Sequence, residues 1–166
     1  MKLLESRKHI LVEKPLAFDR EVISNFFNIA AKNKVFLKVA YNLDYFPGFS
    51  NLKKETESLG NIILFNGFYG NGWLNPDSPP QNWILSKDAQ AGVENYMGCH
   101  MLSLLWNIIP SGQKKIDNKI YGTSTLSEHY FDSSIISMKV GNVLCNITVS
   151  WSCWQNKFEL NVIGTN

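Results

Sequence analysis

The sequence predicts an α/β unit followed by a larger domain that combines helices with a large, mostly antiparallel open sheet (α/β plus α+β). Three observations carry this prediction. Residues 9–40 have the pattern of a strand, a helix and a second strand, residues 41–47 form a polar, aromatic turn, and residues 134–162 alternate between apolar and polar side chains. With 166 residues, 45% of them hydrophobic, the chain is long enough to bury such a core. We place the domain boundary after residue 40, which gives domains 1–40 and 41–166.

The N-terminal unit is predicted from its start and stop signals. The apolar run from His9 to Glu13 is typical of a buried strand, which Pro15 ends because proline cannot donate to a strand ladder. Asp19 is a candidate N-cap, and apolar residues at helical spacing follow it as far as Asn33. Residues 35–40 then form a second strand. Strand, helix and strand in this order predict a right-handed parallel crossover.

The middle of the chain predicts a helix over 48–58, a strand over 61–69 and a second helix over 93–109, which Pro110 stops. Between that strand and that helix, residues 70–92 contain prolines, tryptophans and no regular period. Irregular loops of this length in a compact domain are usually functional or disordered.

The last third of the chain is typical of an antiparallel sheet that is covered on one side. Apolar side chains alternate with largely polar ones over residues 143–151. Gly141 and Asn142 form a two-residue turn that joins this strand to residues 134–140, and residues 158–162 give a further strand.

Charge and cysteine usage exclude several classes of protein. A net charge of +2 without long charged runs predicts neither a nucleic acid nor a membrane partner. The three cysteines show no metal-binding spacing, so reduced thiols in a cytoplasmic protein are the simplest interpretation, with no bound metal. No segment is apolar enough for a signal peptide core or a membrane span.

A lysine follows the first predicted strand, at the edge of the sheet where ligands bind in open α/β folds. The local sequence is Lys8 to Pro15, and Lys14 stands at the carboxyl end of the strand. A lysine here can donate hydrogen bonds to a hydroxyl group and stabilise an alkoxide as it forms. The alternative is a solvated lysine without a function.

The second predicted helix carries a polar stripe that could transfer protons. Tyr96, His100, Ser103 and Asn107 follow one another at helical spacing, which places His100 away from the apolar face. An imidazole titrates near neutral pH, and a phenol can relay a proton to it. The alternative is an exposed histidine without a role. Gly98 lies inside this helix, which predicts a close approach by a ligand or by backbone.

Four features occur in an order that resembles the Gfo/Idh/MocA family of oxidoreductases, which includes glucose-fructose oxidoreductase and inositol dehydrogenase. They are Glu13-Lys14-Pro15, the turn from Asn42 to Pro47, Trp83 ahead of Ala91-Gly92, and Gly98-Cys99-His100. The resemblance extends over nearly the entire chain. It implies a Rossmann nucleotide-binding domain, of which residues 1–40 are the last strands and helix. Residues 41–166 are then a substrate and oligomerisation domain, incomplete at its end.

The family resemblance also implies a cofactor and its contacts. The cofactor is NAD or NADP, and Glu13, Lys14 and Pro15 are the residues that would contact it. Because the chain contains no Gly-x-Gly-x-x-Gly turn, we expect most of the cofactor to be bound by a missing N-terminal part, and the chain to be a fragment.

The catalytic residues implied by the resemblance are Lys14 and His100, with Tyr96 beside them. His100 would take a proton from a hydroxyl group while the carbon loses a hydride to the nicotinamide. Asn42, Trp83 and Asn95 are the expected contacts to the substrate, which would be a sugar, a nucleotide-sugar or a polyol. The open sheet implies a homo-oligomer.

Two substitutions leave other functions open. Tyr96 occupies the position of the family's usual aspartate, and Leu43, followed by Asp44, that of a frequent arginine. One alternative is therefore a non-catalytic binding or oligomerisation module derived from such an enzyme. A third hypothesis is a carbohydrate-binding surface around the loop at 70–92, formed by Tyr69, Trp73 and Trp83.

Overall fold

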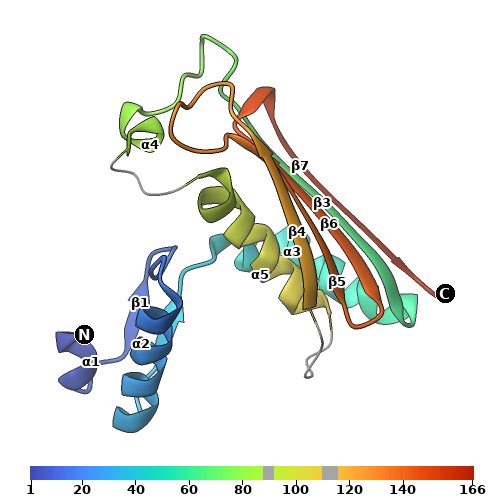
Figure 1. The fold of residues 1–166 in the computed structure, drawn as a ribbon. Helices are drawn as coiled ribbons and strands as arrows, with labels where there is room; N and C mark the ends of the chain where they lie inside the picture. The colour runs from blue at the N-terminus through green and yellow to red at the C-terminus, as the bar shows by residue number, and fades with distance from the viewer. Residues whose placement is uncertain (88–91, 110–115) are drawn as a thin grey trace. The chain divides into compact units, whose positions relative to one another are not determined.

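The N-terminal unit spans Met1–Asn42 and is built on one parallel strand pair (Figure 1). In the computed structural model, which describes residues 1–87, 92–109 and 116–166, its elements are α1 (Lys2–Glu5), β1 (Ile10–Val12), α2 (Arg20–Asn33) and β2 (Leu37–Val39). The predicted crossover is confirmed, because β1 and β2 pair in parallel with Ile10 opposite Leu37. The Asp19 carboxylate accepts a hydrogen bond from the Val22 N–H at 2.9 Å, so the predicted N-cap is also confirmed.

The second unit spans Leu43–Asn166 and contains a five-stranded sheet with its covering helices. Its elements are η1 (Asn42–Tyr45), α3 (Pro47–Thr56), η2 (Glu57–Leu59), β3 (Ile62–Gly72), α4 (Asn82–Leu85), η4 (Glu94–Gly98), α5 (Cys99–Ile108), β4 (Ile116–Thr123), β5 (Ser133–Val140), β6 (Val143–Ser150) and β7 (Ser152–Gly164). The predicted stop at Pro110 lies outside the described residues.

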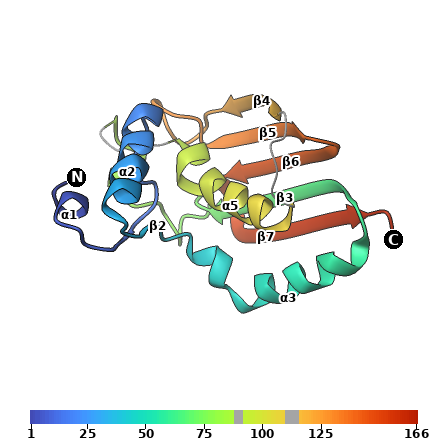
Figure 2. The same cartoon turned by 90° about the horizontal axis from the view of Figure 1, so that it is seen from below.

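The sheet is mixed, with the strand order β4-β5-β6-β3-β7 (Figure 2). The β4-β5, β5-β6 and β3-β7 pairs are antiparallel, as predicted for this part of the chain. The central pair corrects that prediction, because β3 and β6 are parallel, with Phe65 opposite Cys145. Parallel neighbours need a long connection, and here it contains α4, η4, α5 and the two strands β4 and β5.

The predicted hairpin is confirmed in detail. Gly141 has φ 61°, a left-handed conformation that a glycine adopts without strain, and it joins β5 to β6. Every second side chain along β6 is buried from Val143 to Val149, and Trp151 beyond the strand has no exposed surface. The alternation therefore marks the covered face of the sheet.

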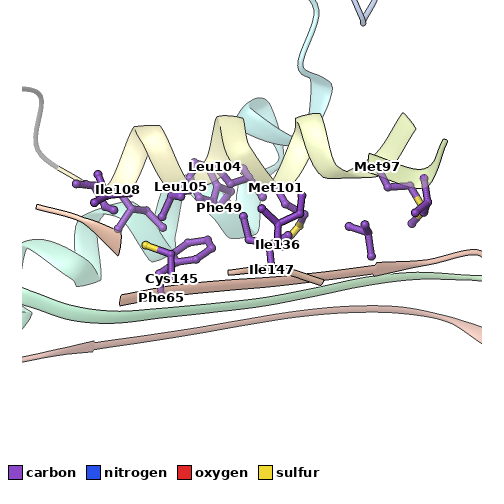
Figure 3. Close-up of a cluster of buried hydrophobic side chains, with 14 of the residues drawn as sticks. Phe49, Phe65, Met97, Met101, Leu104, Leu105, Ile108, Ile136, Cys145 and Ile147 are labelled. Atoms are coloured by element: carbon purple, nitrogen blue, oxygen red, sulfur yellow. The ribbon is translucent and has the colours of Figure 1, made fainter. Parts of the chain in front are cut away.

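Helices α5 and α3 cover one face of the sheet, and Figure 3 shows the contact. The apolar stripe predicted for the second helix is confirmed, since its side chains are buried and point toward the strands: Met97, Met101, Leu104, Leu105 and Ile108. They pack with Phe49 of α3 and with side chains from three strands: Phe65, Ile136, Cys145 and Ile147. No helix of the described residues covers the opposite face in Figures 1 and 2.

Three predicted elements differ in extent. β1 and β2 are shorter than predicted, and β3 continues to Gly72, so regular structure reaches into the expected loop at 70–92. The same segment contains the short helix α4. β4 was not predicted at all: its side chains from Asp117 to Thr123 are all exposed, which leaves little hydrophobic pattern to detect.

Candidate functional site

His100 lies at the start of α5 and is buried, with 7% of its surface exposed. This corrects the prediction that it lies away from the core. Tyr69 of β3 approaches the imidazole edge-on, with ring centroids 6.5 Å apart and planes at 69°. Tyr69 comes from β3, which is far from α5 in the sequence. Its ring therefore covers the side of α5 that a helical projection shows as polar.

The helix that carries His100 does not begin as an α-helix. Residues Glu94–Gly98 form a π-helical turn that runs directly into α5. Turns of this kind are rare and occur frequently at functional sites. The neighbour of Gly98 is a side chain rather than the predicted ligand or backbone, because a Cβ at this position would lie 3.3 Å from Cδ1 of Ile136 on β5.

Tyr96 belongs to a cluster of aromatic rings at the end of β3. Trp73 stacks on Trp151 with centroids 5.1 Å apart and planes at 28°. The Tyr96 ring lies 5.8 Å from Trp151, edge-on, and 6.3 Å from Trp73. The residue at the position of the family's usual aspartate is therefore packed as an aromatic side chain. We call Tyr69, Trp73, Tyr96 and Trp151 the aromatic arc.

Tyr69 connects the aromatic arc with His100. Burial, together with the nearby ionisable groups of Tyr96 and Cys99, raises the pKa of the Tyr69 phenol above its usual value. The phenol consequently keeps its proton throughout the neutral range. On its other side the ring contacts Phe158 of β7 edge-on, with centroids 5.6 Å apart. Sequence reasoning assigned Tyr69 only to a carbohydrate-binding surface and missed its contact with His100.

An apolar cavity of about 480 Å³ lies beside Tyr69. Its walls come from η1, α3, α5, β3 and β7, and they include Phe46, Phe49, Leu52, Leu104, Phe158 and Leu160. Tyr69 therefore forms part of the wall of this apolar cavity and also contacts the imidazole of His100.

Asp44 was noted in the sequence only as a departure from the family's pattern, but it contacts the predicted polar stripe. The Ser103 hydroxyl donates a hydrogen bond of 2.6 Å to Oδ2 of Asp44. The other oxygen, Oδ1, is buried and forms no hydrogen bond with any residue that the structure describes. Asn107 completes the stripe by donating to the Ser103 carbonyl at 3.0 Å. The polar face of α5 is therefore tied to η1.

The loop between β4 and β5 supports the start of the π-helical turn. Asp132 is fully buried, and its carboxylate accepts hydrogen bonds from the backbone N–H groups of residues 125–127 and, at 2.9 Å, from the Ser152 hydroxyl. The neighbouring Phe131 carbonyl accepts a hydrogen bond of 3.0 Å from the Val93 N–H. We call this arrangement the Asp132 clasp.

The predicted substrate contacts lie mostly at the surface. Trp83 on α4 is 58% exposed, and its indole N–H donates to Oε1 of Gln81 at 2.6 Å. Asn95 is exposed on the π-helical turn, and Asn42 is exposed at the start of η1. Trp83 therefore lies outside the aromatic arc. Ala91 of the family pattern is not among the described residues.

The predicted cofactor contacts lie in the N-terminal unit. Glu13, Lys14 and Pro15 directly follow β1, and the Lys14–Pro15 peptide bond is cis. Lys14 is half-buried, whereas Glu13 is exposed. Because β1 and β2 are parallel, both end at the same edge, which is the edge where nucleotides bind in open α/β sheets. The contact of these residues with a nicotinamide stays a prediction.

The described ranges contain neither a metal-binding cluster nor a membrane-spanning helix. In residues 1–87, 92–109 and 116–166, no three histidine, cysteine or acidic side chains gather closely enough to hold a metal ion. Across the same ranges, no helix has both the length and the apolar character required to cross a bilayer.

Comparison with known proteins identifies the family. The profile of the GFO/IDH/MocA C-terminal domain matches residues 54–166, which is more than half of the chain. The chain belongs to the GFO/IDH/MocA family. The match covers the sheet, the π-helical turn and α5, so the GFO/IDH/MocA domain includes His100 and the aromatic arc.

The GFO/IDH/MocA relatives are dehydrogenases of about twice this length. Levoglucosan dehydrogenase of Pseudarthrobacter phenanthrenivorans is 28% identical over 103 residues, which are 60% of this chain and 26% of that protein. Among solved structures, GenD2 from gentamicin A biosynthesis in complex with NAD has a TM-score of 0.85 at 19% identity, covering 99% of this chain and 47% of that chain. Levoglucosan dehydrogenase in complex with NADH and levoglucosan has a TM-score of 0.84 at 21% identity, covering 98% and 47%.

Proposed function

We propose that this chain belongs to an NAD(P)-dependent oxidoreductase that acts on a hydroxyl carbon of a sugar, a nucleotide-sugar or a polyol. The observation that carries the proposal is the buried imidazole of His100 beside the Tyr69 phenol, within a domain that matches the GFO/IDH/MocA profile. Solved structures of similar fold are complexes with NAD or NADH, and one of them also contains levoglucosan.

In this proposal His100 is the general base. An imidazole nitrogen can accept a proton from a substrate hydroxyl, and the burial of His100 holds its ring in a fixed position. Lys14 donates hydrogen bonds to the same hydroxyl and stabilises the developing alkoxide. A nicotinamide bound beside Glu13, Lys14 and Pro15 would supply the hydride acceptor that the oxidation needs. Tyr96 supports the base through the aromatic arc, and Asn42, Trp83 and Asn95 contact the remainder of the substrate.

The pyrophosphate end of the cofactor requires residues of a different kind. A glycine-rich turn at a helix N-terminus normally holds that group, and this sequence contains no Gly-x-Gly-x-x-Gly. We propose that a segment encoded upstream of Met1 supplies it. Sequencing the DNA before Met1 tests this, and an in-frame stop codon directly upstream would contradict it.

Site-directed substitution tests the catalytic assignment in the protein as its host produces it. His100→Asn should lower kcat by about 10²–10⁴, the usual contribution of a positioned general base, and Lys14→Met should lower it as well. The matched control is His129→Asn, because His129 is exposed on the loop after β4. Hydride transfer followed by nicotinamide absorbance at 340 nm is the measurement. Unchanged turnover in His100→Asn would contradict the proposal.

Unchanged turnover in that variant is also the expected result for the second candidate function, a non-catalytic module. The observation that favours it is the packing of Tyr96 against the stacked pair of Trp73 and Trp151, where the family usually has an aspartate. A module of this kind would bind a sugar without oxidising it.

We also propose that the open sheet forms a homo-oligomer. The face opposite α5 presents partly exposed apolar side chains on three neighbouring strands: Tyr121, Ile135 and Leu144 are 60%, 41% and 54% exposed. Surfaces of this kind mark interaction sites when they are contiguous.

A further inference from the structure

Trp73 is held rigidly at the point where β3 leaves the sheet. Its backbone N–H donates to the Trp151 carbonyl at 3.2 Å, and the next N–H, of Leu74, donates to the Cys153 carbonyl at 3.0 Å. The pairing of β3 with β7 shifts register between Gly70 and Gly72. A Cβ at position 72 would lie 2.8 Å from the backbone of Gln155, so only a glycine lets the two strands approach this closely.

The indole of Trp73 has one supported side and one accessible part. Trp151, which has no exposed surface, stacks against it, and Tyr96 flanks it. Trp73 itself keeps part of its surface accessible. A fixed aromatic ring with a buried backing has little side-chain entropy to lose when a second flat group stacks on it.

His100 borders the same arc through two of its members. Tyr96 precedes His100 by four residues, so the two side chains lie on the same side of the helix. Tyr69 contacts the imidazole directly, as described above. Trp73 is thus linked to His100 through Tyr96, whose ring contacts the indole and whose side chain lies on the same side of the helix as the imidazole.

The uncharged side chains of the aromatic arc favour a ligand that has an apolar ring face. Its four members carry aromatic surface, two phenols and two indoles but no charged group. A pyranose or cyclitol ring has an apolar face of C–H groups and a rim of hydroxyls, so its face can be buried on an indole while the rim remains free for hydrogen bonds. An open-chain polyol has no such face.

We propose that Trp73 is the platform on which the ring of an uncharged cyclic sugar or cyclitol stacks, with a ring hydroxyl directed at His100. This inference rests on the proposed function, because it assigns the substrate-binding surface of that site. Stacking is present in the ground state and in the transition state alike, so it lowers KM and leaves kcat largely unchanged.

The test compares Trp73→Leu and Trp73→Phe with Trp106→Leu, a control on α5 whose tryptophan is 49% exposed and lies outside the arc. For a cyclic substrate, Trp73→Leu should raise KM by about five- to tenfold, a change typical of one aromatic contact, and Trp73→Phe by less. KM for an open-chain polyol should not change in any variant. An equal rise for both substrate types, or no rise in a folded Trp73→Leu protein, overturns the proposal.

Calorimetric titration with the same cyclic sugar distinguishes failure of the platform from failure of the proposed enzyme activity. If the wild-type protein transfers no hydride but binds the sugar, and Trp73→Leu weakens binding while Trp106→Leu does not, the platform holds and the oxidoreductase proposal fails. If the wild-type protein does not bind the sugar, the platform is overturned. Thermal unfolding of each variant verifies that it is folded, and Trp73→Phe provides the comparison if Trp73→Leu does not fold.

Discussion

Cys145 shows how the sheet core controls the chemistry of a single side chain. It lies on the covered face of β6 and is 3% exposed. Burial raises the pKa of its thiol from 9.0 to about 11, because the thiolate would lose its hydration in this environment. Only the thiolate reacts with electrophiles, so this cysteine is chemically inert in the folded protein.

We therefore predict that thiol reagents at pH 8 label Cys145 only after unfolding, while the half-buried Cys99 and Cys153 react earlier. Mass spectrometry of peptides after timed labelling is the measurement. Rapid modification of Cys145 in the native protein would contradict the prediction. Cys145→Ala serves as the control that identifies its peptide.

The raised pKa of the Cys145 thiol makes the free energy of unfolding depend on pH. The folded state holds the thiol proton more tightly than the unfolded state, so the stabilisation is complete below pH 9 and is lost as the pH rises toward 11. The shift from 9.0 to about 11 corresponds to about 2.7 kcal/mol in the free energy of unfolding, of which roughly half is lost by pH 10. Urea unfolding at pH 8, 9 and 10 measures it, and the dependence should be weaker in Cys145→Ala. Tyr69, whose pKa is also raised, contributes in the same direction.

The exposure of His100 could not be predicted from its neighbours in the sequence. A helical projection identifies Met97, Met101 and Leu104 as core residues because apolar side chains recur at the right spacing. It contains no information about Tyr69, which comes from a different strand and covers the polar side of the same helix. The candidate residue was therefore found from sequence, but its environment was not.

Among the elements, the loop after β4 is held in place by the carboxylate of Asp132. We predict that Asp132→Asn destabilises the protein by roughly 1–3 kcal/mol, because a neutral amide oxygen accepts the buried N–H groups of the Asp132 clasp less strongly than a carboxylate and the Ser152 hydroxyl loses its acceptor. Urea unfolding measures the change. The matched control is Asp117→Asn on β4, where the carboxylate is exposed and the expected effect is within about 0.5 kcal/mol.

The clasp also connects to the start of the π-helical turn through the hydrogen bond between Val93 and Phe131. Asp132→Asn should consequently increase hydrogen exchange at the Val93 N–H more than at amides in the centre of α5. Equal stability of Asp132→Asn and Asp117→Asn would show that the clasp does not hold this loop.

Elements marked by caps, turn residues or an apolar period could be predicted from the sequence. Features that depend on residues far away in the sequence could not. Asp19 and the apolar period after it predict α2, and Gly141 predicts the β5-β6 hairpin. The parallel pairing of β3 with β6 has no local signal, since alternation along a strand is the same whichever direction its neighbour runs. The π-helical turn at Glu94–Gly98 differs from an α-helix by its hydrogen bonds rather than by its residue pattern.

At the scale of the second unit, the sheet has one covered and one uncovered face. Register places Tyr121 opposite Ile135 and Lys139 opposite Leu144, so these side chains share the face away from α5. If this face joins two copies, Leu144→Lys should lower the oligomeric mass, because it places a second ammonium beside Lys139 in an apolar interface.

Light scattering coupled to size-exclusion chromatography provides the measurement, and Asn51→Lys on the exposed side of α3 is the charge-matched control. An unchanged mass for Leu144→Lys would rule out this face as the interface. A loss of mass in both variants would indicate a general effect of added charge.

The position of β3 between β6 and β7 determines when the sheet can be completed. β3 is made before α5, yet both strands that flank it come from the last quarter of the chain. During synthesis the backbone N–H and C=O groups of β3 therefore remain unpaired while β4 and β5 are made. Late pairing of this kind slows folding and leaves the edges of β3 exposed to other chains. The ribosome must release the residues of β7 before the middle of the sheet can close, and until then the unpaired edges of β3 can associate with other chains.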